Sequence, residues 1–229
     1  MPRLQHSQIP NISQAISLLL IVFLMMFVIG GLILALDPQA AQGNFSANRL
    51  ALSIFISMAC SYLLLVLISK PYWQSRFIPQ LNFNYAWLFG SMTSGLAIAV
   101  LVLQLQTLFP APDTLDTSIG LALSSDPWAK ILVIISVILI APFFEEYLFR
   151  GIFFDSLFKQ WGLFVATVVS AFIFTLFHLF EYHQYWVAWF SVFCLALLLA
   201  FVRYKSQSML NPIALHATYN TTILLVGSN

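Results

Sequence analysis

Charge is scarce in this chain. Charged side chains make up 7% of the 229 residues, whereas hydrophobic side chains make up 61%. A typical soluble domain carries about 25% charged residues, so this composition lacks the polar surface that would keep a folded chain in solution. The net charge is only +1 and no basic stripe runs along the sequence, which argues against nucleic acid as a partner. The sequence therefore predicts an integral membrane protein whose surroundings are the lipid bilayer.

Several common signatures are missing as well. The chain has only two cysteines, Cys60 and Cys194, each inside an apolar stretch, where a free cysteine behaves as a small hydrophobic residue. The zinc-protease motif His-Glu-x-x-His, with two imidazoles one helical turn apart, does not occur. Internal repeats, which many transporters show, do not stand out. The sequence gives no sign of a disulfide framework, of an ordinary zinc protease or of a repeat-based transporter.

Seven apolar segments are long enough to cross a bilayer, which takes roughly 20 residues of helix. They cover approximately residues 14–36, 50–69, 86–109, 129–149, 162–180, 185–202 and 209–227. The first is too long for the apolar region of a signal peptide, so we expect it to be retained as a membrane helix. Residues 151–158 also stay largely apolar; either the fourth segment continues past Arg150 or an eighth, short helix lies there.

We therefore predict an all-α, polytopic membrane bundle of seven to eight transmembrane helices. It forms one integral membrane domain, residues 1–229, in which residues 1–125 carry no motif and residues 126–229 form a catalytic core. The first half would shield the site or admit the substrate.

Lysine and arginine are distributed unevenly between the two sides of this predicted bundle. With the N-terminus in the cytosol, seven basic residues fall at cytosolic ends and only two, Arg49 and Lys130, at outer ends. Cytosolic loops of membrane proteins carry an excess of Lys and Arg, so we predict a cytosolic N-terminus. The seven residues on the cytosolic side are Arg3, Lys70, Arg76, Arg150, Lys159, Arg203 and Lys205.

Three polar clusters interrupt the apolar segments. An ionisable side chain costs roughly 2.5–3.5 kcal/mol at the centre of a membrane helix, so such residues usually have a function. One buried site shared by three helices would explain all of them. The clusters are Glu145, Glu146 and Arg150; Phe174 and His178; and His216 and Asn220.

The first cluster contains two adjacent acids that cannot share one role, because neighbours on a helix point about 100° apart. Glu146 and Arg150 are four residues apart with the acid first, which is the favoured order for a helical ion pair. Arg150 would then neutralise Glu146 and leave Glu145 to face the bundle interior as a general base. Pro142, three residues before Glu145, can open or kink the helix and help water to reach it. The plain alternatives are an interfacial anchor and an ordinary kink.

The other two clusters are histidine-based. His178 shares a helix face with Phe174, although a lone histidine could simply bond a neighbouring carbonyl. His216 and Asn220 also lie four residues apart, so both project from one face of the last helix. Two neutral hydrogen-bond donors on one face suit a developing oxyanion, and interhelical hydrogen bonding is the alternative.

The three motifs resemble those of the CAAX-processing and bacteriocin-processing membrane endopeptidases, also called type II CAAX prenyl endopeptidases or the ABI family. The family pattern is Glu-Glu-x-x-x-Arg, then Phe-x-x-x-His, then His-x-x-x-Asn, and this chain has all three in that order. They are Glu145-Glu146…Arg150, Phe174…His178 and His216…Asn220. The resemblance covers roughly residues 125–225.

This resemblance implies an all-helical membrane protease. Glu145 would activate a water, His178 would help to hold it, and His216 and Asn220 would form the oxyanion hole. Glu146, Arg150 and Phe174 would support them. The resemblance favours a metal-free glutamate mechanism and a site that opens to the cytosolic side. Zinc held by Glu145, His178 and His216 is the alternative, since two histidines and one glutamate are a known catalytic set.

Two questions stay open at this stage. Glu145 lies near the cytosolic end of its segment, whereas His178 is 17 residues into the next one, about 25 Å toward the other face. They can meet only if the fourth helix extends past Arg150 or the fifth starts deep or tilts. The substrate is a peptide or protein, with a prenylated peptide, a bacteriocin-like leader and a membrane segment all open. The rival class is a non-catalytic membrane immunity or scaffold protein, or a proton-coupled transporter.

Overall fold

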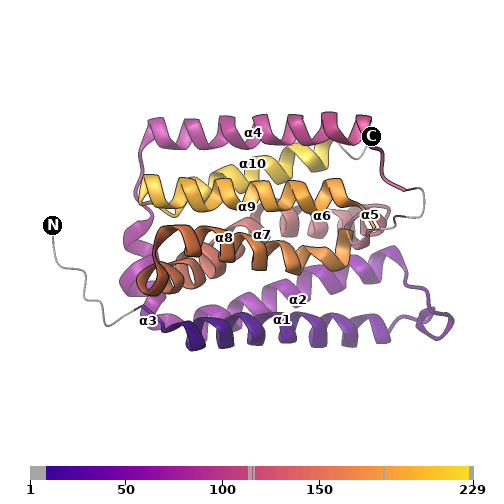
Figure 1. Cartoon of the computed structure of the whole chain (residues 1–229). Helices are drawn as coiled ribbons and strands as arrows, with labels where there is room; N and C mark the ends of the chain where they lie inside the picture. The colour runs from indigo at the N-terminus through magenta and orange to yellow at the C-terminus, as the bar shows by residue number, and fades with distance from the viewer. Residues whose placement is uncertain (1–8, 113–114, 116, 183, 227–229) are drawn as a thin grey trace.

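The structure is a computed structural model that describes residues 9–112, 115, 117–182 and 184–226. Arg3, which entered the prediction of orientation, lies outside these ranges. The described residues form helices, turns and connecting segments without a strand, so the predicted all-α class is confirmed. The long helices run side by side along one common axis, and the chain crosses the bundle from end to end repeatedly (Figure 1).

Most helices begin and end where polar residues and turn formers predict. Helix α1 (Ile12–Ala35) begins with a capping box between Asn11 and Gln14, and α4 (Tyr85–Leu108) begins with Asn84, whose side chain accepts from the Trp87 N–H. The other long helices are α2 (Ala47–Ile68), α9 (Trp186–Ser206) and α10 (Leu210–Val226). Short helices α3 (Lys70–Tyr72) and α5 (Ser118–Ala122) lie in the connectors.

A long helical hairpin forms the centre of the bundle. Helix α6 (Pro127–Ile135), the π-helical turn Ser136–Ile140, α7 (Ala141–Glu146) and the π-helical turn Tyr147–Phe153 follow one another into α8 (Phe154–Tyr182). Within α8, Gly162 leaves helical geometry at φ 77° and ψ −178°, a conformation with positive φ that favours glycine. Pro142 stands in the first turn of α7, directly after a π-helical turn, a feature frequent at functional sites.

The side-chain contacts show that the hairpin folds back at Gly162. Glu145 lies near His178 and Phe149 packs on Phe174, so residues equally far before and after Gly162 face each other. The fourth predicted segment therefore continues past Arg150, and residues 151–158 do not form a separate eighth helix. This arrangement brings Glu145 and His178 to the same depth.

Five helical stretches are long and apolar enough to cross a membrane among the described residues: Ile12–Ala35, Ala47–Ile68, Tyr85–Leu108, Pro127–Leu179 and Trp186–Ser206. The fourth, with 53 residues, contains the hairpin. The structure supports a helical membrane bundle, while the count of seven to eight spans stays a prediction.

The hairpin is packed between two groups of helices. Helices α1 and α2 cover one side, and α4 lies on the other side against α9 and α10 (Figure 1). Close approach of α4 to α10 depends on Gly95, where a Cβ atom would collide with the Leu215 carbonyl oxygen. The largest hydrophobic cluster joins α1, α2, the hairpin and α9, so the motif-free half packs directly against the half that carries the motifs.

Most basic residues gather at one end of the bundle. Lys70 follows α2, Lys159 precedes the reversal at Gly162, and Lys205 lies in the last turn of α9. Arg150, which the sequence placed with these end charges, is fully buried in the hairpin, so that placement was wrong. It is drawn inside by its ion pair rather than left at the membrane surface.

Candidate active site

A buried ion pair anchors the site. Arg150 Nη1 donates to Glu146 Oε1 across 3.1 Å, and neither side chain is exposed. Arg150 Nη2 donates to the Ala196 carbonyl of α9 across 3.1 Å, and its guanidinium lies over the Phe174 ring at 4.5 Å. A buried charge is tolerated only when it is paired and hydrogen-bonded, and these contacts provide that. The predicted pairing of Glu146 with Arg150 is confirmed.

Glu146 also holds the first residue of the third motif. His216 Nδ1 lies 2.9 Å from Glu146 Oε1. A carboxylate paired with arginine can only accept, so the proton of this contact is on Nδ1. A neutral His216 then has no proton left on Nε2. Nε2 is then the ring nitrogen that faces Glu145, and it donates when the ring carries both protons.

Two histidine side chains converge on one carboxylate oxygen. Glu145 Oε2 lies 4.0 Å from His178 Nε2 and 3.9 Å from His216 Nε2. His178 is oriented by a contact of 2.9 Å between Nδ1 and the Phe174 carbonyl oxygen, which is the carbonyl bond considered as the plain alternative for this residue. One ring nitrogen of His178 therefore bonds its own helix, and the other faces Glu145.

The remaining predicted residues surround this point. Asn220 Nδ2 donates to the Val137 carbonyl in the π-helical turn before α7, across 2.9 Å, which uses one of its two N–H groups. Phe174 is buried and packs against both histidine rings. Its ring centroid lies 4.6 Å from that of His178 and 5.9 Å from that of His216. All seven residues of the three motifs therefore lie together, although they come from separate helices.

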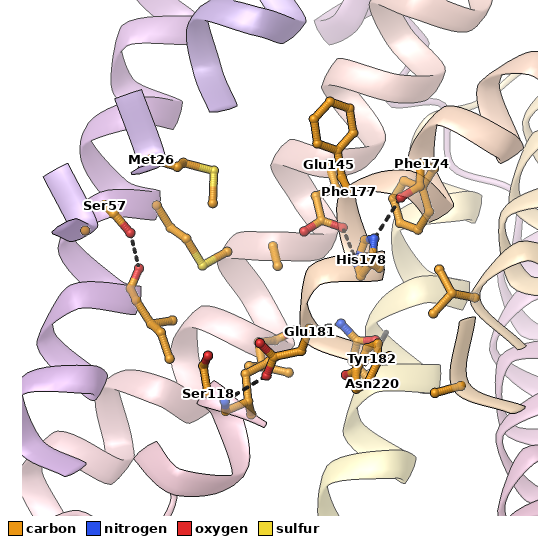
Figure 2. A pocket seen from close by; sticks show the side chains of 18 of the residues that line it. Met26, Ser57, Ser118, Glu145, Phe174, Phe177, His178, Glu181, Tyr182 and Asn220 are labelled. Atoms are coloured by element: carbon orange, nitrogen blue, oxygen red, sulfur yellow. Dashed lines mark hydrogen bonds and ion pairs between the residues drawn. The ribbon is translucent and has the colours of Figure 1, made fainter. Parts of the chain in front are cut away.

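A cavity of about 630 Å³ adjoins these residues. Glu145, His178, His216 and Asn220 line one part of it, and the rest is largely apolar. Figure 2 shows Glu145 and His178 on one wall, with Met26 of α1 and Ser57 of α2 across from them and Glu181 and Ser118 farther along.

Sequence reasoning did not find the cavity wall formed by the first half of the chain. Phe23, Met26, Met58 and Tyr62 all line it, but an apolar residue within an apolar helix gives no sign of what it faces. Their position agrees with the expectation that residues 1–125 shield the site or admit the substrate.

The zinc alternative can be compared with these distances. Two ligands at about 2.1 Å from a tetrahedral zinc lie roughly 3.4 Å apart, and the histidine nitrogens here lie 3.9 and 4.0 Å from Glu145 Oε2. Among the residues that the structure describes, no group of three or more His, Cys, Asp or Glu side chains is placed to hold a metal ion. As they stand, these three residues do not fit a zinc ion.

A second buried ion pair lies nearer the basic end of the bundle. Arg203 Nη2 is 3.4 Å from Asp155 Oδ2 and donates to Gln80 Oε1 across 2.7 Å. The sequence placed Arg203 among the loop charges, but its side chain is almost fully buried. In the sequence, the only sign of a partner for Arg203 was Asp155, an acid within the apolar stretch after Arg150.

Comparison with known proteins agrees with this site. The family model described as type II CAAX prenyl endopeptidase Rce1-like matches residues 127–222. The matched part of the chain contains every motif residue, and it is similar to the family that the motifs resemble. No curated protein and no solved structure matches the chain at a significant level.

The apolar helices and this match together indicate an integral membrane protein. Residues 127–222 are similar to CAAX-type endopeptidases, a family that acts on peptides or proteins.

Proposed function

We propose that the protein hydrolyses peptide bonds within the membrane by means of a water activated by Glu145. The observation that carries this proposal is the convergence of His178 Nε2 and His216 Nε2 on Glu145 Oε2, at 4.0 and 3.9 Å, in the cavity wall. Polar groups separated by more than 3.5 Å are commonly bridged by water. A single water held there would contact the general base directly.

The hydrogen bond of His178 orients this water. Because Nδ1 donates to the Phe174 carbonyl, Nε2 of the neutral ring is an acceptor. The water donates one hydrogen to His178 Nε2 and the other to Glu145, which leaves an oxygen lone pair for the carbonyl carbon. As the new C–O bond forms, Glu145 takes the proton and the carbonyl electrons move to its oxygen. Glu145 then gives the proton to the departing amine nitrogen when the C–N bond breaks.

His216 and Asn220 stabilise the oxyanion in this proposal. His216 acts as an imidazolium whose Nδ1–H is held by Glu146, so its Nε2–H can be donated to the developing negative charge. Asn220 offers the N–H that does not bond Val137. Each donor of this kind typically contributes about 10²–10³ in rate. The apolar remainder of the cavity suits a hydrophobic, lipid-modified or membrane-embedded peptide.

The test compares two carboxylates that line the same cavity. Glu145→Gln removes the base while keeping its shape, and Glu181→Gln changes an acid whose Oε1 accepts from the Ile119 N–H instead. Both variants and the wild type are purified in detergent and tested on a fluorogenic peptide library. We expect Glu145→Gln to lose about 10²–10⁴ in kcat/KM, and Glu181→Gln to stay within a few-fold of wild type.

Equal cleavage by Glu145→Gln and wild type would refute the proposal. A chelator arm tests zinc separately: activity that is lost with chelator and restored by zinc would make Glu145, His178 and His216 metal ligands. A wild type that cleaves no library peptide, while folded, would favour a non-catalytic membrane protein.

A further inference from the structure

On α8 the site lies close to one end of the bundle. His178 is four residues from Tyr182, the last residue of α8, which is about 6 Å of helix. In the other direction, Gly162 is sixteen residues away, or about 24 Å. Glu145 and His216 lie farther from the ends of their own helices, 18 residues after the start of α6 and six after the start of α10, so the extent of the cavity decides which end it reaches.

The cavity occupies the same end of every helix that lines it. From α1 and α4 it takes residues of the C-terminal part, such as Leu34 and Gln106, and from α9 it takes residues of the N-terminal half, such as Ala188. Because these helices alternate in direction (Figure 1), those parts coincide at one end of the bundle. The exposed Ser118 of α5 also lines the cavity there.

Aromatic side chains close the opposite side of the cavity. Phe149 packs edge-on against Phe174 at 4.9 Å and Phe177 at 6.0 Å, and Phe23 of α1 stacks on Phe177. Phe149 and Phe174 are each only 1% exposed. Beyond them lie the buried Arg150 and the second half of the hairpin. We refer to the end with Ser118 as the open end and to the end with Gly162 as the closed end.

Basic residues are concentrated at the closed end. Lys70, Lys159, Arg203 and Lys205 lie there together with the backbone of Arg76, whereas the open end has Arg49 and Lys130. Four against two remain after the buried Arg150 and Arg203 are assigned to the interior and Arg3 is left aside. The open end also carries the acids Asp37, Asp126 and Glu181. By the excess of Lys and Arg in cytosolic loops, the closed end faces the cytosol.

We infer that the catalytic cavity opens to the extracytosolic face of the membrane, and that its substrate is a peptide segment presented at that face. An exported peptide, or the outer end of a membrane segment, would be such a substrate. The inference departs from the cytosolic opening that the family resemblance favours. The inference rests on the proposed function in calling the cavity catalytic. The geometry and the charge distribution that support the opening do not depend on activity.

Cysteine accessibility tests the orientation. In a chain with Cys60→Ala and Cys194→Ala, a single cysteine is placed at the open end by Ser118→Cys or at the closed end by Gln160→Cys; both positions are exposed and uncharged. A membrane-impermeant maleimide is added to spheroplasts of a bacterial expression host, before or after lysis. We expect Ser118→Cys to be labelled in intact spheroplasts and Gln160→Cys only after lysis. The reverse pattern would overturn the inference.

A third variant tests the opening itself. Ser57 lines the cavity and is only 6% exposed, so Ser57→Cys should react with a small charged thiosulfonate in intact spheroplasts. Reaction only after lysis, or no reaction in the folded protein, would overturn the extracytosolic opening. Denatured samples of each variant, fully labelled, show that the thiol is present.

Activity is then measured from the two sides. An impermeant peptide that the detergent-purified protein cleaves should be cut by right-side-out vesicles and not by inside-out vesicles; the opposite preference would overturn the inference. Absence of cleavage in detergent would count against the proposed function alone, because the labelling pattern still reports orientation and opening.

Discussion

The two buried carboxylate–guanidinium pairs of this protein have the same chemistry in different surroundings. Glu146 and Arg150 are one helical turn apart at 3.1 Å, and the carboxylate also holds His216 beside Glu145. Asp155 and Arg203 join α8 to α9 at 3.4 Å, and Arg203 also donates to the neutral Gln80. Burial of a charge pair in a membrane helix therefore does not identify a site. The additional ionisable groups and the cavity next to Glu146 make the difference.

The largest expected effect that separates the pairs is on catalysis. Glu146→Gln removes the negative charge that holds His216 as a donor, so we expect kcat/KM per folded molecule to fall by at least about 10²-fold, the typical value of one oxyanion donor. The measurement is peptide cleavage corrected for the folded fraction, which thermal unfolding in detergent gives. Activity close to wild type would mean that Glu146 only balances the charge of Arg150.

The second pair should affect stability without affecting chemistry. Asp155→Asn removes the carboxylate beside the buried Arg203 guanidinium, and loss of one member of a buried pair costs about 3 kcal/mol or more. We expect a clearly lower unfolding temperature and a kcat/KM per folded molecule within about twofold of wild type. A large loss of activity in the folded fraction would show that the two pairs are coupled through the hairpin.

A smaller effect is expected where the hairpin that carries Glu146 and Asp155 reverses. Gly162 has φ 77°, and a Cβ atom there would meet no other atom within 4 Å. Gly162→Ala should therefore cost only the backbone strain, about 1–3 kcal/mol. Unfolding in detergent measures the cost, and Gly31→Ala, a helical position equally free of contacts, is the matched control. Equal stability of the two variants would contradict the proposed role of Gly162.

The smallest effect concerns a third buried carboxylate, which lies outside the membrane spans. Hydrogen bonds from the Ser46 hydroxyl and the Gln39 N–H lower the pKa of Asp37 below its usual value. A lowered pKa means that Asp37 stabilises the folded state above the pKa of the unfolded chain, roughly 3.9, and that this contribution is lost as the pH falls through the folded pKa.

Asp37→Asn should therefore lower the unfolding temperature slightly at neutral pH, and the difference from wild type should shrink below about pH 4. Thermal unfolding at several pH values measures it. A difference that does not change with pH would assign the effect to packing instead of charge.

The comparison also shows what could be foreseen from sequence. The pairing of Glu146 with Arg150 followed from four-residue spacing on one helix, whereas that of Asp155 with Arg203 joins residues 48 positions apart and was missed. Glu145 and His178 were predicted to share a site, but their depths disagreed, because no pattern within apolar residues shows that a helix continues to Gly162. The role of Arg203 was misjudged for the same reason: a basic residue at the end of a helix looks the same whether it reaches water or a buried acid.

The sequence by itself determined the class of fold and the polar motifs that interrupt the apolar helices. Composition requires a bilayer, helices satisfy the backbone there, and charged groups in such helices are too costly to occur by chance. Only the tertiary structure decided where these residues meet, that α1 and α2 complete the cavity, and toward which end of the bundle the cavity extends. These properties depend on contacts between distant apolar segments, and apolar side chains pack against one another without any preference that is written in the local sequence.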